Sequence, residues 1–118
     1  DNFCGLAGGP CNTTAVAGTG WIAPFTMTLR NLQGRIAANQ GAGDLCVFSV
    51  RRSGVADSCA TAPSVGTLRC GISGVASSCS DTSTTSVITS GYCVELFYDE
   101  DAAGTCAGVV GWSVEARY

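Results

Sequence analysis

The sequence predicts an antiparallel β-sandwich held by disulfide bonds, and three observations support this all-β fold class. Eight cysteines lie within 118 residues that contain no histidine. Glycine accounts for 16 residues, and Ser, Thr and Val are abundant while runs of good helix formers are rare, which favours strands joined by tight turns. Apolar residues also alternate with polar ones along several segments, as in strands with one buried face. The length is that of one domain.

The clearest strand is expected over residues 110–118. Its apolar face consists of Val110, Trp112, Val114, Ala116 and Tyr118. The same alternation predicts strands over residues 92–98 and 45–51. Between Met27 and Ala38 the apolar positions change parity, which predicts a β-bulge or a switch between sheets near Arg30–Asn31.

The cysteines are expected to form disulfides rather than a metal site. They occupy positions Cys4, Cys11, Cys46, Cys59, Cys70, Cys79, Cys93 and Cys106. No two of them have Cys-x-x-Cys spacing and there is no histidine, so the ligand pattern of a zinc site is missing. Structural disulfides persist in oxidising compartments, so we expect an extracellular or cell-surface protein.

A near-repeat suggests how six of these cysteines pair. The segment Ser53–Cys59 is echoed twenty residues later by Ser73–Cys79, and in both a Ser-Gly turn signal precedes the cysteine. Two hairpins would centre beside these turns, and a third would centre on the polar residues Asp99–Glu100. The resulting hypothesis is three cross-strand disulfides, Cys46 with Cys59, Cys70 with Cys79, and Cys93 with Cys106.

The first eighteen residues are predicted to form a flexible, Gly- and Pro-rich N-terminal arm, and residues 19–118 the sandwich domain. Two readings of the arm cysteines remain open. Cys4 and Cys11 close a small loop on each other, or they bond to neighbouring subunits. In the second reading a head-to-tail contact that does not close on itself produces a filament.

The residue inventory argues against most enzymatic and nucleic-acid functions. Without histidine or lysine there is no Ser–His or Cys–His pair, no Schiff-base amine and no P-loop cation. The net charge is −3 and the basic residues cluster only at Arg51–Arg52, which gives no footprint for nucleic acid. No run of ~18 apolar residues is present to span a membrane. We therefore expect no catalytic residues, no cofactor and no membrane span.

The acidic residues, and Arg69 next to Cys70, do not change this expectation. Asp99–Asp101 has the oxygen ligands that calcium prefers, but such a run is more often a solvated loop tip, so no metal is expected. Nothing in the sequence pairs Glu95 or Glu115 with a second carboxyl, as a glycosidase needs. Arg69 beside Cys70 is the one cation adjacent to a cysteine, but neighbours on a strand point to opposite faces.

The aromatic residues leave a second class of function open. Trp21, Phe25 and Tyr98 would offer stacking surfaces to a sugar if they are exposed, whereas Trp112 lies in an apolar register that suits the core. The alternative reading is thus a secreted module that binds a carbohydrate or a cell-surface receptor.

Three segments resemble small bacterial extracellular jelly-roll domains of the tumour-necrosis-factor-like kind. They are residues 70–82, residues 86–96 and the closing Val110–Ala116, within a resemblance that spans Met27 to Tyr118. The resemblance implies a jelly-roll sandwich and a module that trimerises or polymerises on cell or spore surfaces. A cysteine-bearing arm ahead of a jelly roll is similar in layout to the disulfide-linked subunits of bacterial endospore appendages.

These observations together predict a structural subunit of an extracellular or surface assembly, such as a filament or an appendage. Its main partner would be copies of itself, joined by edge or face association and by capture of the arm, with Cys4 and Cys11 locking it.

Overall fold

The computed structural model describes residues 2–5, 20–38, 41–56, 59, 65–100 and 109–118. Within these residues the protein is all-β and contains no helix, which confirms the predicted fold class. The strands are β1 (Asn2–Gly5), β2 (Trp21–Ile22), β3 (Met27–Ile36), β4 (Gly41–Arg52), β5 (Val65–Gly74), β6 (Ser78–Ile88), β7 (Cys93–Glu100) and β8 (Val109–Arg117).

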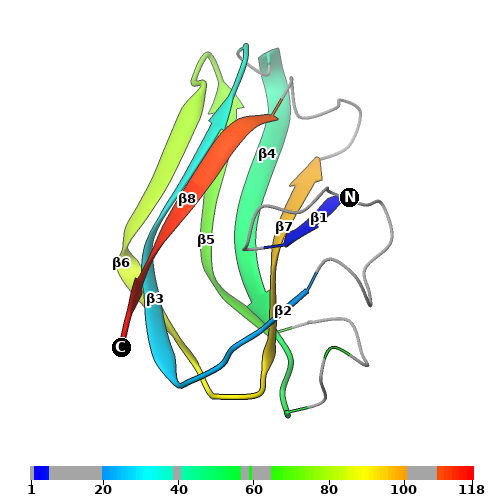
Figure 1. Ribbon diagram of the computed structural model, residues 1–118. Coiled ribbons are helices and arrows are strands. Elements are labelled where there is room, and N and C mark those ends of the chain that lie inside the picture. The colour runs from blue at the N-terminus through cyan, green and yellow to red at the C-terminus, as the bar shows by residue number, and fades with distance from the viewer. Residues whose placement is uncertain (1, 6–19, 39–40, 57–58, 60–64, 101–108) are drawn as a thin grey trace.

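The strands form two antiparallel sheets that pack as a sandwich (Figure 1). The larger sheet has the order β1–β7–β4–β5, with β2 also paired to β7, and the smaller sheet has the order β6–β3–β8. In the sequence, the pair β4–β7 lies within the pair β3–β8, and the pair β4–β5 lies within the pair β3–β6. This nesting wraps the chain around the sandwich as in a jelly roll.

The bulge predicted from the change of parity in β3 is present. Met27 and Leu29 are buried before it and Leu32 after it, and the register to β6 shifts between Arg30 and Leu32. Asn31 occupies the left-handed region with a φ of 53°. A slip of one residue moves a strand's apolar set to the other face, so the extra residue keeps both halves of β3 facing the core.

The core lies between the two sheets. Its largest fully buried side chains include Leu29, Leu32, Ile36, Phe48, Leu68, Ile72, Ile88 and Leu96. Phe48 of β4 packs directly on Gly34 of β3, and its ring lies 6.0 Å from that of Tyr98. Because Gly34 has no side chain, the central strands of the two sheets can carry an aromatic ring between them.

Two strands differ from the expected pattern of one buried face. In β7 both faces are buried from Cys93 to Phe97, since Cys93 is bonded to Cys59 and the guanidinium of Arg51 lies 3.4 Å from the centre of the Phe97 ring. In β8, Trp112 and Val114 pack against the core as predicted. The last residues of the predicted apolar face, Ala116 and Tyr118, are exposed.

Candidate functional site

Two disulfides lie within the described residues and connect different parts of the sandwich. Cys70 of β5 is bonded to Cys79 of β6, with Cα atoms 5.7 Å apart. The pairing is the one expected from spacing, but β5 and β6 belong to different sheets, so the bond closes one side of the sandwich rather than one ladder. Cys59 is bonded to Cys93 at the start of β7, with Cα atoms 4.9 Å apart.

The other two predicted pairings are wrong. Cys59 bonds Cys93, which excludes both the Cys46–Cys59 and the Cys93–Cys106 bonds. Cys46 is disulfide-bonded and fully buried, opposite Ile72 in the β4–β5 ladder. The chain does fold back along β4, but only from Val65 onward as β5. Cys59 therefore lies in the connection before β5, beside the start of β7, rather than opposite Cys46. The side chains of Cys4, Cys11 and Cys106 lie outside the described residues.

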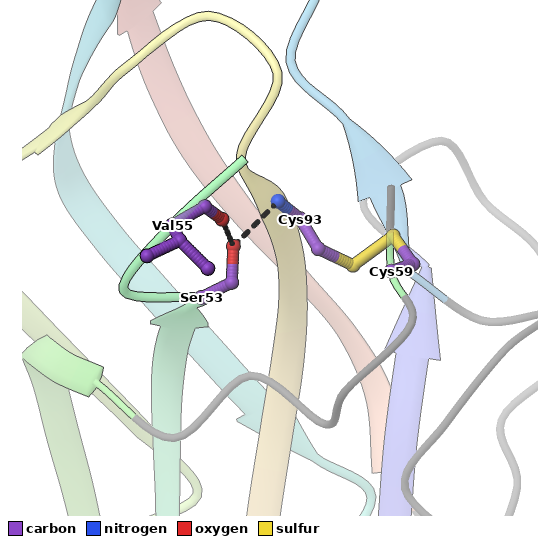
Figure 2. The surroundings of a disulfide bond; sticks show 4 residues. All are labelled: Ser53, Val55, Cys59 and Cys93. Carbon is purple, nitrogen blue, oxygen red and sulfur yellow. Dashed lines mark hydrogen bonds between the residues drawn. A yellow bond between two sulfur atoms is a disulfide. The ribbon is translucent and has the colours of Figure 1, made fainter. Parts of the chain in front are cut away.

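A buried serine fixes the chain where it leaves β4, as Figure 2 shows. The Ser53 hydroxyl donates a hydrogen bond to the Val55 carbonyl at 2.7 Å and accepts one from the Cys93 amide at 2.9 Å. The Ser53 amide donates to the Cys93 carbonyl at 2.9 Å. The near-repeat contains this serine, but the repeat alone does not predict that Ser53 hydrogen-bonds to Cys93 of β7.

The second copy of the near-repeat has a different local structure. Ser73 and Gly74 end β5, and the Ala76 amide donates to the Ser73 carbonyl at 3.2 Å, which closes a tight turn. Gly74 supplies the positive φ of 58° that this turn uses. Both copies place an exposed valine, Val55 and Val75, between the serine and the disulfide cysteine.

The side of the sandwich closed by Cys70–Cys79 is also held by a carboxylate. Asp81 of β6 accepts hydrogen bonds from the amides of Arg69, Ser83 and Thr84 at 3.4, 3.1 and 3.0 Å. Although burial opposes it, the pKa of Asp81 is lowered, because these hydrogen bonds favour its charged form. Asp81 thereby links β6 to β5 of the opposite sheet.

Glu115 of β8 binds the bulged part of β3. It accepts two hydrogen bonds from Arg30, at 3.1 and 3.0 Å, and further bonds from Asn31 at 2.5 Å and Arg117 at 2.7 Å. The Arg30 hydrogen bonds, followed by that of Arg117, lower the pKa of Glu115 to about 2. This carboxylate therefore connects β8 to β3, and the bulge that positions Asn31 is what gives it a third donor.

The remaining charged candidates do not gather into a cluster. Glu95 is fully buried in β7 and lies opposite Arg51 in the β4–β7 ladder. Arg69 is exposed, whereas the adjacent Cys70 is buried in its disulfide. The side chains of Asp99–Asp101 lie outside the described part. Among the residues that the structure describes, no group of three acidic, cysteine or histidine side chains is placed to hold a metal ion.

Of the aromatic residues suggested as stacking surfaces, only Phe25 is exposed, at 44 %. Its ring packs edge-on against that of Tyr118, with centroids 4.5 Å apart. Trp21 and Tyr98 are half-buried and pack against the core, as does Trp112. The three candidates therefore do not form one stacking platform.

The first strand connects part of the predicted arm to the domain. β1 pairs with β7 in the register Asn2 with Tyr98 to Gly5 with Glu95, so Cys4 lies within a paired strand. The rest of the predicted arm, residue 1 and residues 6–18, lies outside the described residues. The strand is therefore tied to the sandwich through backbone pairing, at the end of the larger sheet's strand order.

Comparison with known proteins adds no assignment: no protein-family model, no curated protein and no solved structure matches the chain. Across the described residues there is likewise no helix long and apolar enough to cross a membrane.

Proposed function

We propose that the protein is a structural subunit of an extracellular or surface assembly, such as a filament or an appendage, joined through its N-terminal arm. The observation that carries this proposal is β1, a four-residue strand that pairs with β7 and is followed by a long connection to the domain. A strand attached in this way can pair with β7 of its own copy or with β7 of a neighbour, because the backbone hydrogen bonds are the same.

The length of the connection supports an exchange between copies. Residues 6–19 are fourteen residues, and an extended chain of that length spans up to ~46–50 Å. The longest dimension of the molecule is 40 Å. The arm is therefore long enough for its first strand to reach an adjacent copy without moving the domain.

The disulfides support the proposed location and the proposed lock. Bonds such as Cys59–Cys93 and Cys70–Cys79 persist where the surroundings are oxidising, which suits an extracellular or surface protein. In the same surroundings Cys4, carried on an exchanged β1, would form its disulfide with the neighbouring subunit. Edge association would add to this contact, since within the described residues β8 pairs only with β3.

The test is electron microscopy of the native protein, together with denaturing gels run with and without reductant. We expect filaments or ladders that collapse to a monomer of 11.9 kDa only on reduction. A double variant, Cys4→Ser with Cys11→Ser, should release monomers under conditions where the parent stays assembled. The matched control, Cys70→Ser with Cys79→Ser, also removes two thiols but should keep the ladder. A clean monomer in both lanes with no assembly on the grid would refute the proposal.

A further inference from the structure

The outer face of the smaller sheet carries two rows of polar residues that cross all three strands. One row is Ser80, Gln33 and Ser113, and the next is Ser78, Arg35 and Gly111. Every side chain in these rows is exposed. The row between them, formed by Cys79, Gly34 and Trp112, is on the core side, where Cys79 bonds the opposite sheet and Gly34 meets Phe48.

These rows line a groove of about 630 Å³ on the sheet. The groove exists because the residues on both outer strands are small, serine on β6 and serine or glycine on β8, while the long side chains come from β3. A Cβ at Gly111 would meet no atom within 4 Å, so the groove is open at that position. Its volume is in the range of sites that bind small ligands.

The groove offers a cation that the fold does not use. Arg30 and Arg117 are both committed to Glu115, and Asp81 is held by backbone amides. Arg35, in contrast, makes no hydrogen bond or ion pair with the described residues, although it lies in the groove. Its guanidinium is thus available to a ligand.

We propose that this groove binds an acidic saccharide, a sugar that carries a carboxylate or a sulfate. The Arg35 guanidinium has the planar geometry that binds such groups through two parallel hydrogen bonds. Gln33 and the three serine hydroxyls both donate and accept, which matches the hydroxyls of a sugar ring. This binding function goes beyond the assembly proposed above and does not depend on it.

A saccharide fits the groove better than a peptide. Extended peptides bind β-proteins mainly by adding a strand to a sheet edge, where unpaired backbone groups are available. Here the groove lies on the face of the sheet, and the backbone of β3 is already paired to β6 and β8 on its two sides. A ligand on this face can be recognised only through side chains, and those are hydroxyl, amide and guanidinium groups.

The test is a titration of the full chain with a heparin tetrasaccharide, followed by NMR amide shifts and calorimetry. We expect saturable binding with shifts centred on Gln33, Arg35 and Ser113. Replacing Arg35→Gln should weaken binding at least tenfold, whereas Arg69→Gln, which removes an exposed arginine on β5 of the other sheet, should leave it unchanged. Gly111→Leu should weaken binding by filling the groove with the net charge unaltered.

Three comparison ligands separate the proposal from simpler explanations. A neutral tetrasaccharide of the same length and inorganic sulfate should each bind much more weakly than the heparin fragment. Equal binding of sulfate would reduce the site to a general anion site and overturn the proposal, as would equal binding of an acidic tetrapeptide. No saturable binding by the parent, or equal losses in the Arg35 and Arg69 variants, would also overturn it.

Discussion

Replacing Gly34 with alanine should disturb the contact between the two sheets. A Cβ at this position would stand 2.5, 2.7 and 2.8 Å from three ring carbons of Phe48, where ordinary contacts lie at 3.4–4 Å. Phe48 is fully buried and its ring lies 6.0 Å from that of Tyr98, so relieving the clash requires a shift within the core. Overpacking of this kind costs ~1–3 kcal/mol. We therefore expect Gly34→Ala to lower the free energy of unfolding by that amount.

Thermal unfolding with the disulfides intact measures this effect, and the midpoint should fall by roughly 4 °C for each kcal/mol. The matched control is Gly111→Ala on the adjacent strand β8, where a Cβ meets no atom within 4 Å and stability should be unchanged. The double variant Gly34→Ala with Phe48→Leu should lose less than the sum of its two single variants, because the smaller side chain relieves the clash. Equal midpoints for Gly34→Ala and Gly111→Ala would refute the reasoning.

Three further predictions concern the residues that fix individual strands. Ser53→Ala should cost ~1–3 kcal/mol in urea unfolding, because the buried Cys93 amide loses its acceptor, and an unchanged midpoint would contradict this role. The pKa of Glu115 is lowered to about 2 in the folded protein, so its stabilising effect is present above the ordinary pKa of 4.5 and is lost as pH falls towards 2. The parent should therefore lose more thermal stability than Glu115→Gln as the pH falls from about 5 to about 2. Parallel stability profiles of the two proteins would exclude this linkage. Gly20→Ala would bring a Cβ onto the sulfurs of Cys93 and Cys59, so thiol titration after refolding should find more free cysteine than in the parent, and equal thiol content would rule this clash out.

Alternation predicted β3, β4, β7 and β8, but not β5, although β5 also has one buried face, formed by Leu68, Cys70 and Ile72. The parity change in β3 located the bulge at Arg30–Asn31, because period-two alternation records which face each residue takes. In β7 the same reasoning was incomplete, since what covers the second face comes from elsewhere in the chain. Phe97 lies beneath Arg51, a residue of the neighbouring strand, and no pattern within β7 reveals that contact.

For the disulfides, the sequence predicted the pair that is close along the chain but not the pair that is distant. Cys70 and Cys79 are nine residues apart and flank a turn, so spacing was sufficient to pair them. Cys59 and Cys93 are 34 residues apart, and their contact depends on β7 lying beside the end of β4. The polar groove was hidden for the same reason, because Gln33, Ser80 and Ser113 become one row only through the register of three strands.

The two described disulfides also bear on how an exchanged arm would be tolerated. In the chain-entropy description, closing loops of 34 and 9 residues stabilises the folded domain by ~4 and ~2.5 kcal/mol. Both bonds lie between Cys59 and Cys93, so neither constrains β1. In the proposed exchange, these two bonds would stay intact while β1 leaves its own β7 and pairs with that of another copy. The proposed assembly requires such a domain, in which bonds outside the arm hold the domain together.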